Sequence, residues 1–119
     1  MNSTPSSVTI KILREHFRTA YNFNDVQIDL MVVSSARSIQ AAFLAFDMIL
    51  DGEDVHEKLV VIAHGLKGLL LNMGQDEWAG YVREMENAAS AGEDHDYKEM
   101  MQRLRLGLQE VSRIPAVSF

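Results

Sequence analysis

The segment VIAHGLKGLLLNMG, residues 61–74, contains the side chains of this chain that are best suited to chemistry. A neutral imidazole attacks phosphoryl groups through its unprotonated nitrogen, which makes His64 a candidate nucleophile. Lys67, one helical turn later, supplies an ammonium that stabilises phosphoryl oxygens. Gly68 follows it, although glycine costs a helix interior about 0.8–1.0 kcal/mol relative to alanine. These residue types indicate a nucleophile, a cation beside it and room for another molecule to approach.

The helical period predicts that these residues share one exposed surface. Apolar residues recur at steps of three and four and define the buried side of a helix: Leu59, Ile62, Leu66, Leu69 or Leu70, and Met73. His64, Lys67 and Gly68 then face away from the core, and Val60 and Leu71 form an apolar rim for a partner. Two plainer explanations stay open, because an exposed histidine is usually only a surface residue and a glycine often permits close helix packing.

The composition indicates one domain and argues against several classes of partner. The 119 residues are 47% apolar, which is enough for one core. The formal charge of −6 argues against nucleic acid and against an anionic membrane surface, since both favour clustered Lys and Arg. Cysteine is absent, and neither an export signal nor an apolar run of roughly 18 residues is evident. We therefore expect a cytoplasmic protein that binds neither nucleic acid nor membrane.

Helices are expected throughout, because the two prolines, Pro5 and Pro115, lie at the ends of the chain. The pattern predicts a short first helix that ends near Asn22. A long second helix is expected to begin with a capping box formed by Asn24 and Gln27. We expect this second helix to end at Gly52 and a third helix to run from Asp54 to Gly74. A fourth helix is expected to end at Gly92, and a last helix to run from about Asp94 to Ser112.

Short connections between long helices make sequence neighbours run antiparallel. The sequence therefore predicts an all-α protein, an antiparallel up-down four-helix bundle with an additional short N-terminal helix. The expected organisation is an N-terminal tail and short helix over residues 1–23, the bundle over 24–113 and a C-terminal tail over 114–119.

The segment around His64 resembles the signature of histidine-containing phosphotransfer (HPt) domains. That signature reads Ala, His, any residue, Leu or Ile, Lys and Gly, with a further Gly six residues on. The matching residues are Ala63, His64, Leu66, Lys67, Gly68 and Gly74. Two downstream pairs are also similar to the family. Met85 with Glu86 resembles its Leu-Glu pair near a helix end, and Gly92 with Glu93 resembles its Gly-Asp turn. The family usually has a small residue after the Lys-Gly pair, whereas this chain continues with leucines at positions 69–71.

The resemblance implies a phosphocarrier without kinase activity of its own. HPt domains are antiparallel four-helix bundles that carry a phosphoryl group on an exposed histidine, normally at Nε2, and exchange it with an aspartate of a response-regulator receiver domain. On this chain His64 would be the phosphoacceptor, Lys67 would contact phosphoryl oxygens and Gly68 would leave clearance for the receiver. The receiver's carboxylates hold the divalent metal, so no metal or cofactor is expected here. A receiver domain, a hybrid histidine kinase or both are the expected partners of a free-standing monomer.

Two other functions are weighed against this one. The same bundle could be an interaction module that binds a receiver or kinase as inhibitor or scaffold, with His64 incidental. An enzyme that uses His64 as a general base is the weaker alternative, because no acid, oxyanion donor set or cofactor signature accompanies the histidine.

Overall fold

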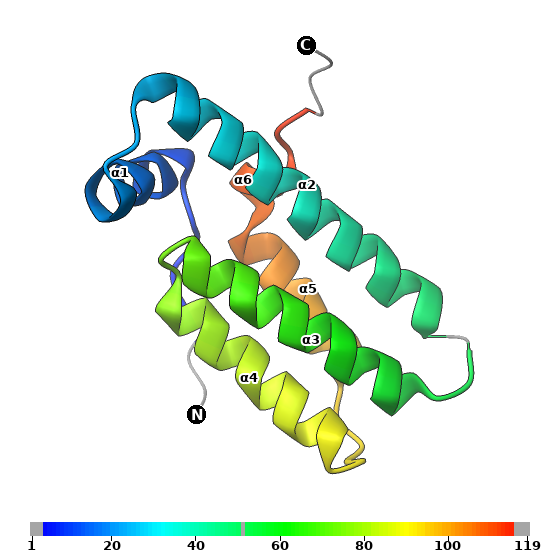
Figure 1. Ribbon diagram of the computed structural model, residues 1–119. Helices are drawn as coiled ribbons and strands as arrows, with labels where there is room; N and C mark the ends of the chain where they lie inside the picture. Colours follow the sequence, from blue (N-terminus) through cyan, green and yellow to red (C-terminus); the bar gives the residue numbers. More distant parts are fainter. Residues whose placement is uncertain (1–3, 51, 116–119) are drawn as a thin grey trace.

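Helices form all the regular structure in residues 4–50 and 52–115, the part of the chain that the computed structural model describes (Figure 1). They are α1 (Ile10–Tyr21), α2 (Asp25–Ile49), α3 (Val55–Asn72), α4 (Asp76–Ser90), α5 (Tyr97–Gly107) and α6 (Gln109–Ser112). The all-α class predicted from the sequence is confirmed.

Side-chain caps determine where the first two helices begin. Thr9 Oγ1 accepts a hydrogen bond from the backbone N–H of Ile12 at 3.1 Å and caps α1. The capping box of α2 is present as predicted, since Asn24 and Gln27 each accept from the other's backbone N–H at 2.9 Å. Asp54 stands at the N-cap position of α3 as expected, but it adopts a left-handed conformation, with φ 57°, and its side chain makes no capping hydrogen bond.

The C-terminal helix differs from the single helix predicted between Asp94 and Ser112. It begins at Tyr97, where Asp96 Oδ1 accepts from the backbone N–H of Glu99 at 3.0 Å, and Leu108 separates α5 from α6. Val8 donates its backbone N–H to the carbonyl of Gly107 at 2.8 Å. That carbonyl therefore bonds to the N-terminal segment, whereas a continuous helix would use it four residues further on.

The core is built from α1 to α6 together, with α3 packed along α4 on one side and against α2 on another (Figure 1). α5 contacts α4, α6 contacts α2, and α1 packs against α2. Of the positions predicted to face inward around His64, Leu59, Leu66 and Met73 are buried, and so are apolar residues of the other helices: Ile28, Ile39, Phe46, Trp78, Met85, Leu104 and Val111. The N-terminal segment belongs to the same core, since Val8, Leu13 and Phe17 are fully buried in it.

α2 is long and apolar enough to cross a membrane by length and composition alone, with a mean hydropathy of 1.3 over its most apolar window. The expectation that no stretch approaches a membrane span is thus too strict. Scattered polar residues interrupt the apolar run of α2, but its mean hydropathy stays high enough for a span. Core helices of soluble proteins pass the same test, so this feature does not decide where the protein resides.

Candidate functional site

His64 lies on the outer face of α3, and its side chain is 71% exposed. Ala63, Leu66 and Leu70 are buried on the other side of the helix. The packing of these three residues turns the imidazole toward solvent. The exposure of His64 predicted from the helical period is confirmed.

Glu86 of α4 binds both His64 and Lys67. Nδ1 of His64 lies 2.9 Å from one carboxylate oxygen, and Nζ of Lys67 lies 2.6 Å from the other. The side chains of Lys67 and Glu86 are only 19% and 14% exposed. A single, largely shielded carboxylate therefore holds two side chains that stand one turn apart on the neighbouring helix.

The protonation of Glu86 determines which nitrogen of His64 is free. The hydrogen bond from Lys67 lowers the pKa of the Glu86 carboxyl; partial burial opposes this shift, and the hydrogen bond from His64 adds to it. An ionised carboxylate only accepts hydrogen bonds, so Nδ1 of His64 is the donor. The neutral ring then has its lone pair on Nε2. The site thus presents an exposed ring nitrogen that is ready to act as a nucleophile.

Two glycines leave the surface beside His64 bare. A Cβ added at Gly65 or Gly68 would meet nothing within 4 Å, so neither glycine is needed for packing inside the chain. Close helix packing therefore does not explain Gly68. Gly80 on α4 is equally open, so open space alone does not mark a site. Gly65 and Gly68 differ from Gly80 because they adjoin an exposed histidine on the same helix.

The apolar rim differs from the prediction at one residue. Leu71 is exposed as expected, but Val60 is half-buried against the core. Val60 stands two turns before Lys67, on the side of α3 that faces α4, and this packing covers it. Its neighbour Val61 is 72% exposed instead. Val61 and Gly65 border a hollow of about 540 Å³ between α2 and α3 that includes Ala41.

Sequence reasoning assigned no role to Glu86, although it noted the residue beside Met85 in a family-like pair. One sequence feature could have indicated Glu86 as a site residue: it directly follows a core residue of α4, at the edge of the buried face. The sequence pattern did bring His64, Lys67 and Gly68 together on α3. His64 and Gly68 are exposed as predicted, whereas the side chain of Lys67 is largely shielded because it turns toward Glu86 of α4.

Comparisons with known proteins identify no relative: no family model, no curated protein and no solved structure matches the chain. The all-helical fold and the exposed, carboxylate-bound histidine therefore carry the functional assignment.

Proposed function

We propose that the protein is a histidine phosphotransfer protein of a two-component phosphorelay. It accepts a phosphoryl group on His64 and exchanges it with the aspartate of a response-regulator receiver domain. The observation that best supports this function is the 2.9 Å hydrogen bond from Nδ1 of His64 to Glu86, made by a ring that is 71% exposed. The resemblance of residues 63–74 to the HPt signature gives His64 the same role.

The transfer is a displacement at phosphorus. The lone pair on Nε2 of His64 forms an N–P bond while the P–O bond to the donor aspartate breaks, and that electron pair leaves with the aspartate carboxylate. The ring becomes a cation that keeps its proton on Nδ1, where the carboxylate of Glu86 stabilises the new charge. Lys67 neutralises the phosphoryl oxygens. The protein is a carrier without kinase activity, and the receiver holds the divalent metal.

The docking surface that we propose for the receiver is the outer face of α3 beside the hollow toward α2. Gly65 and Gly68 give the clearance that a partner needs to reach His64. Val61 and Leu71, both exposed, supply apolar contacts on either side of the histidine. We expect a receiver domain, a hybrid histidine kinase or both as partners of a cytoplasmic monomer.

The proposal includes an arrangement of the helices. α2, α3, α4 and α5 would form an antiparallel four-helix bundle, with α1 as the additional N-terminal helix. The packing of α3 against α2 and α4, and of α4 against α5, supports this arrangement. The left-handed turns at Gly74 and Gly92 reverse the chain between these helices and also support it.

The alternative function is an interaction module that binds a receiver or kinase as inhibitor or scaffold. The bare apolar surface around His64 supports docking whether or not transfer follows. The two functions differ in whether His64 itself is needed.

Chemical phosphorylation tests the carrier function. We expect the wild-type chain to gain one phosphoryl group on incubation with phosphoramidate, detected by intact mass and lost in acid but stable in base, as phosphohistidine is. His64→Gln should gain none, whereas His95→Gln, which removes another exposed histidine, should label normally. No labelling of the wild type under conditions that label a known histidine carrier would overturn the proposal in favour of the interaction module.

A second pair of variants tests the docking surface. Gly68→Gln should keep its phosphoramidate labelling, because the substituted side chain extends into solvent, but should exchange phosphoryl groups with pre-loaded receiver domains at least tenfold more slowly. Gly80→Gln places the same side chain at an equally open position of α4 and should exchange at the wild-type rate. Equal rates for the two variants would show that no partner approaches Gly68.

A further inference from the structure

The outer side of α2 carries large apolar side chains that the rest of the chain does not cover. α2 lies along one edge of the molecule, where α1, α3 and α6 pack against its inner side (Figure 1). On the outer side, four apolar residues are 55–74% exposed: Val26, Leu30, Leu44 and Met48. Only 28% of the most apolar 18-residue window of α2 is buried within the described chain. Packing inside one copy of this chain therefore does not account for how apolar the helix is.

These residues belong to a regularly spaced row, which we call the α2 stripe. Its positions follow one another by steps of 4, 3 and 4 residues, and the same three steps then repeat: Val26, Leu30, Val33, Arg37, Ala41, Leu44 and Met48. Steps of three and four keep a row on one side of a helix, and an 11-residue repeat is close to three helical turns. Arg37 stands at the centre, so the spacing reads the same from either end of the helix.

The symmetry of the α2 stripe suits a second copy of the same helix. Two identical helices can lie antiparallel across a twofold axis that passes beside Arg37. Each position then meets the position equally far from the centre on the other copy. Val26 lies opposite the partner's Met48 in this arrangement, and Leu30 lies opposite the partner's Leu44. The stripe is therefore complementary to itself.

The area of the α2 stripe also fits a dimer. At their exposed fractions, the four large side chains present roughly 500 Å² of apolar surface, which is near the upper limit for patches on soluble monomers. The 25 residues of α2 span about 38 Å, and the smaller residues of the stripe extend the surface along this length. Pairing along the whole helix therefore approaches the roughly 800 Å² per partner of a standard interface.

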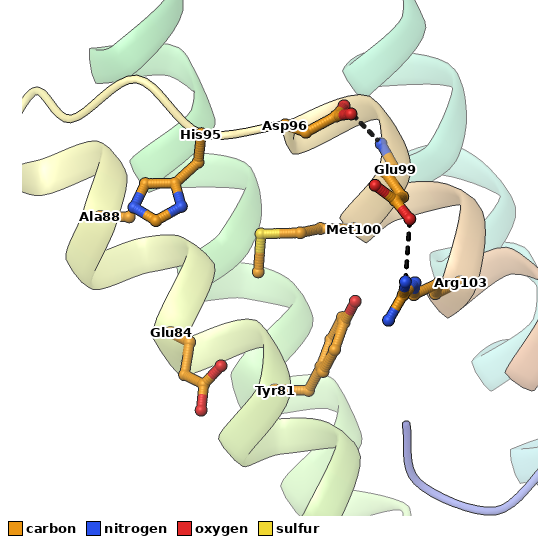
Figure 2. A pocket seen from close by; sticks show the side chains of 8 residues that line it. All are labelled: Tyr81, Glu84, Ala88, His95, Asp96, Glu99, Met100 and Arg103. Atoms are coloured by element: carbon orange, nitrogen blue, oxygen red, sulfur yellow. Dashed lines mark hydrogen bonds and ion pairs between the residues drawn. The ribbon is translucent and has the colours of Figure 1, made fainter. Parts of the chain in front are cut away.

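The surface between α4 and α5 has the opposite character. The hollow there, of about 270 Å³, is lined largely by charged side chains (Figure 2). Asp96 accepts a hydrogen bond from the backbone N–H of Glu99 at 3.0 Å, and Glu99 pairs with Arg103 at 2.8 Å. All three residues are exposed to solvent. Such a surface does not favour contact between two copies of a chain with a formal charge of −6, whereas the α2 stripe does.

We propose that the protein forms a homodimer through the α2 stripe, with the two copies of α2 antiparallel. The stripe contains no residue of α3, so His64 stays accessible in both copies. This inference goes beyond the proposed function and does not depend on phosphotransfer. The expectation of a monomer came with the family resemblance, and the dimer takes its place.

Sedimentation equilibrium of the full chain tests for the dimer. We expect the mass to rise from that of one chain toward twice that value as the protein concentration increases. Leu44→Glu should weaken association by roughly tenfold or more, because it places a charge in the apolar contact. Leu106→Glu makes the same change at a residue of α5 that is 57% exposed, and it should associate as the wild type does. A monomer at every concentration up to the millimolar range, or equal weakening in both variants, would overturn the proposal. Circular dichroism verifies that the variants are folded.

Arg37 provides a test in the opposite direction. At the twofold axis it meets the partner's Arg37, and like charges that face each other weaken an interface. Arg37→Leu should therefore tighten association several-fold. Arg83→Leu removes the same charge from an exposed position of α4 and should not tighten it. Equal effects of the two variants would argue that Arg37 lies outside the contact and would contradict the proposed axis.

The chain has no cysteine, so single cysteines report the orientation of the helices. Arg37→Cys places two thiols at the axis and should form disulfide-linked dimers on oxidation with copper phenanthroline. Met48→Cys alone should not, because its two copies would stand about 33 Å apart, too far for a disulfide. Mixed with Val26→Cys, it should form a linked dimer of the two variants. Linkage of Met48→Cys to itself as readily as Arg37→Cys would show a different arrangement and overturn the proposal.

A lipid surface is the competing occupant of this face, since α2 is long and apolar. Flotation with phosphatidylcholine vesicles distinguishes it from a second copy. We expect the wild-type chain to remain unbound. Vesicle binding that Leu44→Glu abolishes, by a chain that is monomeric without vesicles, would assign the α2 stripe to a membrane and overturn the dimer.

Discussion

The carboxylate of Glu86 links the chemistry of the site to the packing of α3 on α4. Its pKa is lowered in the folded protein, chiefly by the hydrogen bond from Lys67. A group with a lowered folded pKa binds fewer protons when folded than when unfolded. Its contribution to stability is therefore complete above its ordinary value of 4.5 and is lost as the pH falls through the lowered folded value.

This linkage predicts a pH-dependent effect of Glu86→Gln. The substitution should reduce the free energy of unfolding by about 1 kcal/mol at pH 7, because it weakens the hydrogen bonds of two donors. At pH 3 the loss should be smaller, since protonation has by then removed part of the wild-type contribution. Urea unfolding at both pH values measures the difference, with Glu53→Gln as the exposed control. A loss of equal size at both pH values would contradict the assignment of an ionised Glu86.

The residues of the site could be predicted from the sequence only as far as one helix determines them. The exposure of His64 follows from the period of α3 alone. Its hydrogen bond to Glu86 depends on how α3 and α4 are rotated against each other, which the pattern of one helix does not contain. The same cause explains why Val61 is exposed where the sequence predicted Val60. Neighbours on a helix are about 100° apart, so packing against α4 decides which of the two is covered.

At the scale of elements, Gly74 and Gly92 end α3 and α4 in the same left-handed conformation, with φ 74° and φ 68°. Only Gly74 also meets another helix, because a Cβ there would overlap the ring of His16 in α1. Nε2 of His16 lies 3.0 Å from the carbonyl oxygen of Asn72 at the end of α3. A Cβ at Gly92 would meet nothing within 4 Å.

Alanine at these two positions should therefore have different costs. Gly92→Ala is expected to lose about 1 kcal/mol from backbone strain alone. Gly74→Ala should lose about 2–3 kcal/mol, because it also displaces His16 from Asn72. Chemical denaturation measures both losses. When His16→Ala is already present, the further cost of Gly74→Ala should fall to that of Gly92→Ala. Equal single-variant losses would show that α1 does not rest on this turn.

The helices could be predicted where a local signal defines them and not where a distant partner does. The capping box of Asn24 and the turns at Gly74 and Gly92 need only neighbouring residues, and all are present. The separation of α5 from α6 coincides with a hydrogen bond from Val8 to Gly107, 99 positions along the chain. No window of local sequence contains that partner.

At the scale of the whole molecule, Trp78 joins three segments that are far apart in the sequence. Its ring N–H donates to the carbonyl of Ser6 at 2.9 Å, and its ring faces Gly107 at the end of α5. Val8 bonds to the same glycine. The N-terminal segment, expected as a tail and short helix beside the bundle, is held by this junction and shares the core through Phe17. Burial of that kind follows from three-dimensional packing, which the helical period alone does not predict.

Substituting alanine at two glycines tests the importance of this junction. Helix propensity predicts the same change in stability at both positions, whereas packing predicts opposite changes. Alanine is the better helix former, so propensity alone favours both Gly80→Ala and Gly107→Ala by up to about 1 kcal/mol. At Gly80 the new Cβ meets nothing within 4 Å, and we expect that gain in urea unfolding. At Gly107 the Cβ would overlap the ring of Trp78, which is fully buried and cannot move aside without repacking. We therefore expect a loss of about 1–3 kcal/mol and an altered tryptophan emission spectrum. A gain at both positions would mean that the ring has room to shift, and that the N-terminal segment is held by its apolar side chains instead of this contact.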